Sequence, residues 1–260
     1  MEEAIDLKIK NSSKDEKVER LHTDIPGFDE LIEGGFPVGS VNVFTGTAGS
    51  GKSIWAQNMV ANFVHSYRKK VLYLSFEQPE WEIIDQGFQF GWNFQAMITE
   101  GQLKFIALDS QELFDFQQID DITKMIAEGG YQVVVFDSIS SVFDSPISTS
   151  QILNSTERGI TPQIFMEIRR ANITSFFNAL KKLRVTIICI AQKIEGRPGD
   201  TTDNIIEFKG DSLTLLDFVE VGDEITRTIK VKKMRKTNIN GLTHPFEFTQ
   251  KGIRVKRKEV

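Results

Sequence analysis

The chain has 260 residues, a mass of 29.5 kDa and a formal net charge of −5, with 40% hydrophobic and 26% charged residues. This size fits one large domain or two small ones, and this composition is ordinary for a soluble globular protein. The single cysteine, Cys189, excludes a disulfide framework, and three scattered histidines give no zinc-ligand spacing. No run of 18 apolar residues and no apolar signal region occur, so we expect a cytoplasmic protein without a membrane span.

Charge is distributed unevenly along the chain. Residues 226–260 contain 11 Lys or Arg and 2 Asp or Glu, so the rest of the chain carries an excess of negative charge. A basic end on an acidic body is compatible with self-association, with an anionic ligand or with nucleic acid. It is equally compatible with a solvated basic strand.

Secondary-structure patterns divide the chain into an arm and one domain. Residues 1–20 are rich in charge and poor in apolar residues, which predicts a flexible N-terminal arm, and residues 21–260 are expected to form the domain. After a short helix at 26–35, strands are expected at 40–45, 70–76, 103–108, 133–136 and 185–191. Helices are expected between these strands, at 53–67, 79–90, 119–130 and 162–183.

The order of these elements predicts an α/β fold. Strands that alternate with helices form a mostly parallel sheet with helices on both faces. Four further strand patterns follow without helices between them, at 213–221, 227–234, 245–249 and 252–256. We expect these final strands to be antiparallel additions at one edge of the sheet.

The strongest motif is GTAGSGKS at 46–53, which fits the phosphate-loop pattern G-x-x-x-x-G-K-[ST] directly between a strand and a helix. Backbone N–H groups of such a loop, together with the start of the helix, bind phosphate oxygens. Lys52 is expected to reach the β- and γ-phosphates, and the Ser53 hydroxyl to ligate Mg²⁺. The expected nucleotide-binding residues are Gly46, Thr47, Ala48, Gly49, Ser50, Gly51, Lys52, Ser53 and Ile54.

Three polar residues end strands of the expected sheet. Asp137 ends the buried strand at 133–136 and is expected to hold Mg²⁺ beside Ser53, because ligands of α/β sheets bind at this edge. Glu77 ends the strand after the phosphate-loop helix and could activate the water that attacks the γ-phosphate, or could cap the next helix. Gln192 ends the strand at 185–191 and could sense the γ-phosphate, or be an ordinary polar strand end.

The basic run KKMRK at 232–236 places Lys233 and Arg235 two residues apart, on one side of a strand. Two such cations could reach a phosphate bound by another subunit, in the manner of an arginine finger. Basic residues also protect edge strands from aggregation, and the spacing alone does not separate the two interpretations.

Together these segments resemble the KaiC-like branch of the RecA-type P-loop ATPases, over about residues 21 to 256. The similar segments are TDIPGFDELIEGGFPVGSVNVFTGTAGSGKS, YLSFEQPE, FGW, VVVFDSISSV, KVKKMRKTNI and HPFEFTQKGIRV. The resemblance implies a RecA-like fold, with ATP and Mg²⁺ held between adjacent subunits of a homo-oligomeric ring, usually a hexamer.

The resemblance also implies a role for each matching residue. Lys52 and Ser53 match the phosphate loop, and Asp137 matches the Walker B acid. Glu77 matches the first of two adjacent acids, one of which activates water, while Lys233 and Arg235 match a K-x-R motif that reaches the neighbour's γ-phosphate.

The chain departs from the family pattern at three places. Gln78 stands where many members have a second Glu, which suggests slow hydrolysis. Glu207 and Phe208 stand where the circadian clock protein has its phosphorylated Ser–Thr pair, which argues against autokinase activity. The usual His after K-x-R is replaced by Asn238 or Ile239.

The expected function is therefore a slow, ring-forming ATPase that uses Mg-ATP as a regulatory switch on a protein partner. One alternative is a recombinase-like ATPase that binds single-stranded DNA through a polar loop at 193–204 and the basic end. That loop has only Lys193 and Arg197 as cations and no aromatic residue for base stacking. The other alternative is an ATP-binding scaffold with little hydrolysis, like the KaiC-type component of the archaellum motor.

Overall fold

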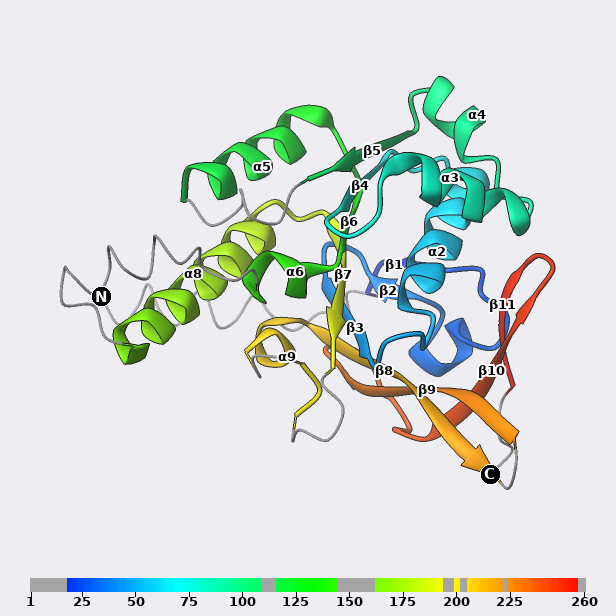
Figure 1. Cartoon of the computed structure of the whole chain (residues 1–260). Coiled ribbons are helices and arrows are strands. Elements are labelled where there is room, and N and C mark those ends of the chain that lie inside the picture. Colours follow the sequence, from blue (N-terminus) through cyan, green and yellow to red (C-terminus); the bar gives the residue numbers. More distant parts are fainter. Residues whose placement is uncertain are drawn as a thin grey trace, which may run out of the picture.

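The computed structural model describes residues 18–108, 116–144, 162–193, 199–201, 205–221 and 224–256. Its centre is a nine-stranded sheet with the strand order β11-β10-β9-β8-β3-β7-β6-β4-β5 (Figure 1). The strands are β3 (Val41–Gly46), β4 (Val71–Ser75), β5 (Leu103–Ala107), β6 (Val133–Asp137), β7 (Thr186–Gln192), β8 (Ser212–Val221), β9 (Glu224–Met234), β10 (Thr243–Thr249) and β11 (Gly252–Val255).

The strands from β8 to β5 in this order are parallel, and β9, β10 and β11 are antiparallel additions. The predicted fold class is therefore confirmed. One part of the prediction is wrong: β8 pairs in parallel with β3, so the antiparallel edge begins at β9. The chain returns from β7 to the far side of β3 before β8, which gives β8 the direction of the central strands.

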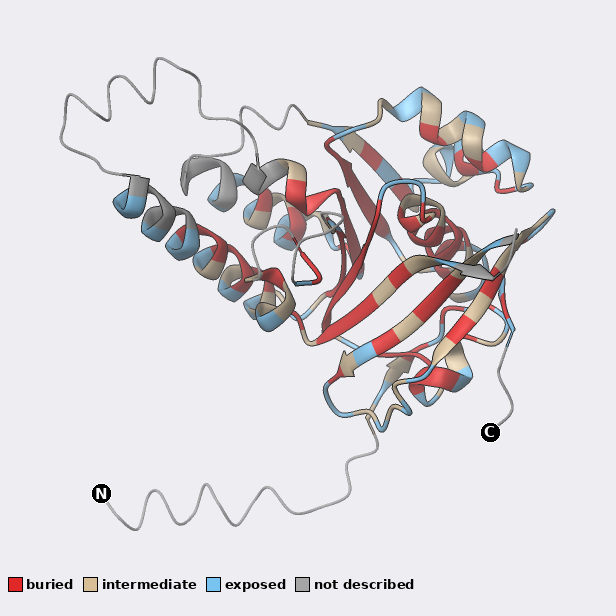
Figure 2. Cartoon of the chain, turned by 60° about the horizontal axis from the view of Figure 1, so that its bottom comes forward, coloured by how far each residue is buried: buried red, intermediate tan, exposed pale blue. Residues whose placement is uncertain are grey.

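Helices cover both faces of the sheet, which explains why β3, β4 and β6 are buried at every position (Figure 2). The helices are α2 (Lys52–Tyr67), α3 (Glu80–Gln89), α4 (Phe94–Thr99), α5 (Phe116–Gly129), α6 (Ile139–Asp144), α8 (Pro162–Lys182), α9 (Ile206–Lys209) and the 3₁₀ helix η1 (Asp29–Ile32). Among the described helices, none is long and apolar enough to cross a membrane.

Alternate strand residues divide the buried side chains between two cores. The core on one face joins α2, α3 and α4 to the sheet through Trp55, Phe63, Ile83, Phe94, Phe44, Tyr73, Val135 and Ile188. The core on the other face joins α5 and α8 to the sheet through Ile122, Ile126, Ile173, Phe177, Val43, Leu74, Phe136 and Cys189. This two-sided burial fixes the sheet and leaves its carboxyl edge free to carry a site.

Three elements have no counterpart in the predicted pattern. They are the two-stranded sheet of β1 (Arg20–Leu21) and β2 (Phe36–Pro37), helix α4 and helix α9. All three are short, and short elements are specified mainly by tertiary contacts. The predicted N-terminal arm lies outside the described residues up to residue 17, as do 194–198 and 202–204 of the predicted loop at 193–204.

Candidate functional site

The phosphate loop lies between β3 and α2, as the motif predicts. Gly51 precedes the helix in a left-handed conformation (φ 97°), and the Trp55 N–H donates to its carbonyl at 3.0 Å. A Cβ atom on Gly46 would lie 1.9 Å from the Leu216 carbonyl oxygen, so only glycine fits there. The sequence thus places glycine where the loop needs a left-handed turn and a close approach to β8.

Lys52 is buried and folds back over the loop, where its Nζ donates to the Thr47 carbonyl oxygen at 2.8 Å. Burial lowers the pKa of this ammonium group, and the carboxylates of Asp137, Glu77 and Asp217 act in the opposite direction. The Ser50 hydroxyl donates to the same Thr47 carbonyl at 2.8 Å. The loop is therefore closed on itself around a buried cation.

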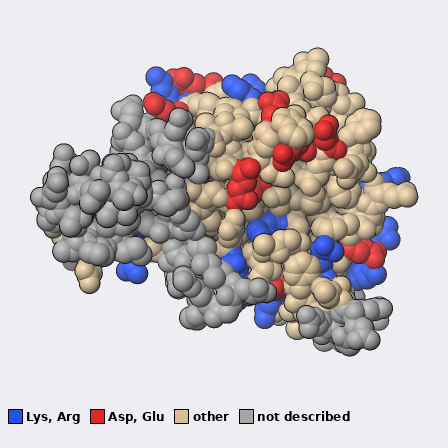
Figure 3. Space-filling model, in the orientation of Figure 1, with Lys and Arg blue, Asp and Glu red and all other residues tan. Residues whose placement is uncertain are grey.

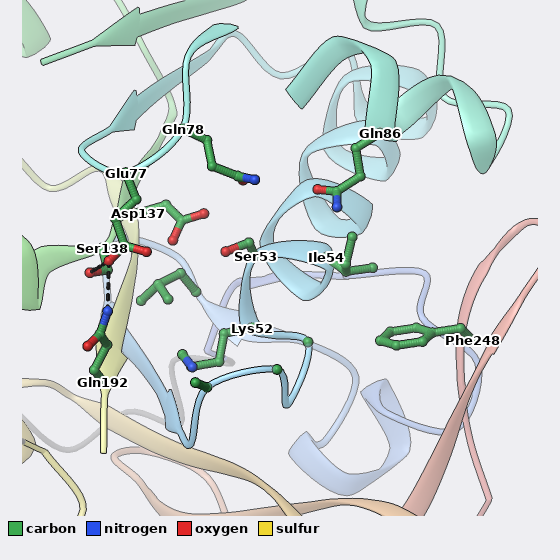
Figure 4. Close-up of a pocket in the computed structure, with 14 residues that line it drawn as sticks. Lys52, Ser53, Ile54, Glu77, Gln78, Gln86, Asp137, Ser138, Gln192 and Phe248 are labelled. Carbon is green, nitrogen blue, oxygen red and sulfur yellow. Dashed lines mark hydrogen bonds between the residues drawn. The ribbon is translucent and has the colours of Figure 1, made fainter. Parts of the chain in front are cut away.

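A pocket of about 500 Å³ opens in front of this loop (Figure 4). This volume lies within the range of small-ligand sites. Glu77, Asp137 and Gln192 lie on one side of the pocket and Phe248 on the other. The lining residues are Ala48, Gly49, Gly51, Lys52, Ser53, Ile54, Glu77, Gln78, Gln86, Asp137, Ser138, Ile190, Gln192 and Phe248.

The pocket is built by four neighbouring parallel strands. In the order β3, β7, β6 and β4, these strands end at the phosphate loop, Gln192, Asp137 and the segment that carries Glu77. Parallel pairing places all four ends at the same edge of the sheet. Residues 46–54, Glu77, Asp137 and Gln192, which are far apart in sequence, are thereby brought to one edge.

Asp137 is buried, and its Oδ2 accepts a hydrogen bond from the Tyr73 hydroxyl at 2.5 Å. Burial raises the pKa of the Asp137 carboxyl, while hydrogen bonds from Tyr73 and Ser53 act to lower it. A carboxylate beside a serine hydroxyl is an oxygen-donor pair of the type that Mg²⁺ prefers. The residues present therefore fit the predicted metal role.

One carboxylate oxygen of Glu77 accepts three hydrogen bonds. The Ser138 and Ser141 hydroxyls each donate to Oε1 at 2.6 Å, and Gln192 Nε2 donates at 2.8 Å. We call these three residues the Glu77 clamp. It fixes the carboxylate beside the pocket and joins Gln192, the expected γ-phosphate sensor, directly to the expected base.

Lys233 and Arg235 lie away from the pocket of their own subunit, since neither lines it. Lys233 Nζ donates to the Gly210 carbonyl oxygen at 2.7 Å, and Arg235 contacts Asp211 at 2.9 Å. Their predicted placement on one strand face is wrong, because β9 ends at Met234 after a bulge and Arg235 lies in the following turn. Both side chains still reach the same segment, 207–211.

Sequence reasoning did not find several residues of this site. Tyr73, Ser138 and Ser141 bind the two carboxylates, and Phe248 forms the far wall. Ser138 and Ser141 follow Asp137 in DSISS, so their closeness to the strand end was a usable signal. Phe248 enters from β10 and has no local signal, because only the tertiary fold brings it to Gly51.

A glycine-rich loop between a parallel strand and a helix, with an acid ending a strand two places away, defines a P-loop nucleotide-binding protein. The sheet order and the antiparallel edge place it in the RecA-like fold. The family model described as "ATPase: KaiC" matches residues 21–260. The chain belongs to this KaiC family of ATPases.

Curated relatives agree with this family. The chain is 28% identical over 246 residues to the circadian clock oscillator protein KaiC 1 of Synechocystis sp., covering 92% of this chain and 44% of the relative. It is 29% identical over 260 residues to KaiC of Rippkaea orientalis, covering 95% of this chain and 47% of the relative. The chain thus spans about half the length of these relatives.

A solved structure agrees with the fold. The KaiC-like protein of the hyperthermophilic archaeon Pyrococcus horikoshii OT3 superimposes with a TM-score of 0.77 and 24% sequence identity. The match covers 92% of this chain and all of that chain. At this identity the likeness establishes the fold, and roles for individual residues need their own argument.

Proposed function

We propose that the chain binds ATP at the phosphate loop and hydrolyses it slowly, as a regulatory switch on a protein partner. The observation that carries this proposal is the convergence of the phosphate loop, Glu77, Asp137 and Gln192 at one sheet edge. The loop N–H groups and Lys52 would bind the phosphates. Glu77 would orient and deprotonate the attacking water.

Mg²⁺ would be held by the Ser53 hydroxyl and the Asp137 carboxylate. Among the described residues no group of three or more His, Cys, Asp or Glu could hold a metal ion. A cation at this position would therefore take its other ligands from phosphate oxygens and water, as Mg²⁺ ordinarily does. When bound, it would neutralise phosphate charge during transfer.

We propose further that the chain forms a hexameric ring, in which Lys233 and Arg235 act on the nucleotide of the adjacent subunit. They lie outside their own pocket, at segment 207–211, and Arg235 is more than half exposed. An exposed guanidinium can stabilise phosphate charge in trans. Each nucleotide would then sit between two subunits.

Slow turnover is supported by Gln78, which lines the pocket as a neutral amide beside Glu77. The Gln78 backbone is held in place, because Ser75 Oγ donates to the Gln78 carbonyl oxygen at 2.5 Å and accepts from the Gln78 N–H at 3.1 Å. One acid therefore remains to activate water. A slow enzyme of this kind suits a switch better than a motor.

The test is phosphate release per subunit with Mg-ATP over a wide range of protein concentration. A site shared between subunits predicts that specific activity rises steeply with concentration and then reaches a plateau, because assembly completes the site. The Lys52→Ala variant, which lacks the phosphate-loop lysine, is the negative control. Constant specific activity at every concentration would exclude the shared site, and ATP binding without phosphate release would favour a scaffold.

A further inference from the structure

The turn that follows β9 is bound by a residue from the beginning of the described chain. Arg20, in β1, donates from Nη2 to the Lys236 carbonyl oxygen at 2.8 Å and from Nη1 to the Thr237 hydroxyl at 3.0 Å. The Thr237 hydroxyl donates to the Arg235 carbonyl oxygen at 3.4 Å. Arg20 therefore holds the turn directly after Arg235, from a position 216 residues before Lys236 in the sequence.

The guanidinium group of Arg20 is itself fixed by the segment at 32–35, just before β2. Nη1 donates to the carbonyl oxygens of Ile32 at 3.2 Å and Gly35 at 3.0 Å, and Nη2 donates to the Glu33 carboxylate at 2.8 Å. Only 13% of the Arg20 side chain is exposed, so these charged hydrogen bonds are largely shielded from water. A planar guanidinium with five N–H donors can join two segments in this way, whereas the compact ammonium group of a lysine offers one point of contact.

The turn needs this support because its own conformation is unfavourable. Lys236 has a left-handed backbone (φ 59°), which is strained for a residue other than glycine. Figure 3 shows Lys and Arg side chains gathered around β8 and β9, so like charges also repel one another here. Burial lowers the pKa of the Lys233 ammonium group, and the positive charge of Arg235 lowers that pKa further. Without Arg20, strain and repulsion would both favour a different conformation of the turn.

Asp211 holds Arg235 itself. The Arg235 N–H donates to the Asp211 carbonyl oxygen at 2.9 Å, and Arg235 Nη1 donates to Asp211 Oδ1 at 2.9 Å. Oδ1 also accepts from Lys181 Nζ at 2.8 Å, and Oδ2 accepts from the Val41 N–H at 3.0 Å. Asp211 therefore fixes the start of the turn, and Arg20 fixes its end.

We infer that Arg20 is a positioning residue for Arg235, which sets the geometry in which the Arg235 guanidinium meets the phosphate of an adjacent subunit. The inference rests on the proposed action of Arg235 in trans, and it adds a residue that does not line the pocket. Loss of the Arg20 hydrogen bonds would leave the pocket intact and let the turn move. Because a displacement of about 1 Å can lower a rate by about 10²-fold, hydrolysis should be sensitive to such a movement.

Arg20→Ala tests the inference in the assembled protein. Phosphate release is measured with Mg-ATP at a protein concentration where specific activity has reached its plateau, and assembly is followed by sedimentation. We expect Arg20→Ala to lose at least about 10-fold in activity. Thr237→Ala removes one contact with the turn and leaves Arg20 in place, so its loss should be smaller. Arg68→Ala, which removes an exposed arginine paired with Glu100, is the control and should keep the wild-type activity.

Mixed assemblies separate positioning from general damage to the subunit. Arg20→Ala subunits keep an intact pocket and present a displaced Arg235, so Lys52→Ala subunits should restore their activity, as they should restore that of Arg235→Ala. Mixing Arg20→Ala with Arg235→Ala should restore none, because no subunit then presents a well-placed Arg235. Recovery with Arg235→Ala instead of Lys52→Ala would place the defect in the pocket and overturn the inference. Thr237→Ala takes the place of Arg20→Ala in these mixtures if the latter does not assemble.

The outcomes also separate the inference from the function on which it rests. If Arg235→Ala keeps the wild-type activity, the proposed action in trans fails, and the inference fails with it. If Arg235→Ala loses activity while Arg20→Ala and Thr237→Ala assemble and keep theirs, the inference alone fails.

Discussion

At the scale of single residues, the Glu77 clamp fixes how the carboxylate of the proposed base is oriented toward the attacking water. Among the described residues, the three donors all bind Oε1, and Oε2 would accept a proton from a water in the pocket. The Ser138 and Ser141 hydroxyls orient the carboxylate through Oε1. Ser138 and Ser141 are therefore positioning residues rather than catalytic ones.

Removing the two hydroxyls tests the clamp. We expect Ser138→Ala/Ser141→Ala to lower kcat about 10-fold, since a hydrogen bond to a charged group contributes roughly 1.5–3 kcal/mol and Gln192 remains. The affinity for ATP should stay unchanged, because neither hydroxyl belongs to the phosphate loop. Single-turnover hydrolysis and equilibrium binding measure the two effects. Ser66→Ala, exposed on α2, is the control, and a parallel loss of affinity would contradict the positioning role.

Glu77→Gln tests the base itself. The neutral amide has nearly the same shape but cannot take a proton, so hydrolysis should fall by about 10²–10⁴-fold while nucleotide binding and assembly persist. Phosphate release and sedimentation of the variant measure these properties. Retained turnover would assign proton transfer to another group, such as the phosphate itself.

The pair Tyr73 and Asp137 predicts a pH effect. Burial raises the pKa of Asp137, and the Tyr73 hydrogen bond opposes that rise. Tyr73→Phe removes the opposing effect, so the pKa should rise further and protonation should begin at higher pH. Because Mg²⁺ needs the carboxylate, the acid limb of Mg²⁺-dependent ATP binding should move to higher pH. An unmoved or lowered acid limb would contradict this assignment.

At the scale of elements, the β10–β11 hairpin and the phosphate loop form one packed unit. A Cβ atom at Gly51 would lie 2.6 Å from the Phe248 ring, and Arg227 lies on that ring at 4.8 Å from its centroid. The Phe248 ring is thus held between Arg227 and the loop. The shape of the phosphate loop therefore depends on a hairpin about 200 residues further along the chain.

Substitution of Gly51 tests this coupling. Gly51→Ala should reduce ATP affinity at least 10-fold, because it combines a left-handed backbone with a clash against Phe248. Gly91→Ala is the matched control, since Gly91 also has positive φ (76°) but would meet nothing within 4 Å. The control should lose about 1 kcal/mol of unfolding free energy and keep its ATP affinity. Equal affinity losses in the two variants would show that backbone strain alone is responsible.

At the scale of the whole molecule, the distance between the pocket and the Lys233–Arg235 segment determines whether one subunit can complete the nucleotide site. The pocket lies at the carboxyl ends of β3, β4, β6 and β7, whereas Lys233 and Arg235 contact Gly210 and Asp211. Neither Lys233 nor Arg235 reaches the pocket of its own subunit. A single subunit would therefore supply the pocket of one shared site, and Lys233 and Arg235 of a second shared site.

Mixing Lys52→Ala with Arg235→Ala subunits tests this division. Each variant alone should be inactive, since every site lacks either its phosphate loop lysine or its guanidinium. Mixed assemblies should recover activity, up to about one quarter of the wild-type value if subunits mix at random, because a fraction of junctions pairs an intact pocket with an intact Arg235. No recovery at any mixing ratio would count against action in trans.

Much of the fold and of the candidate site could be predicted from sequence, and each success has a local cause. The phosphate loop, the strand ends at Asp137 and Gln192 and the α/β class depend on periodicity and spacing within single elements. The predictions that were wrong or incomplete concern features that are set by pairing between segments far apart in sequence. The direction of β8, the bulge near the end of β9, and helices α4 and α9 follow from pairing and packing with distant segments.

The sequence by itself determined the family, the phosphate-loop motif and the acids at the strand ends, because glycine conformations, helix starts and strand ends are local properties. Only the tertiary structure decided that Ser138, Ser141 and Gln192 converge on one oxygen of Glu77, and that Lys233 and Arg235 lie outside their own pocket. Strand order and register set these distances. Both depend on contacts between segments far apart in sequence, so a local sequence pattern does not predict them.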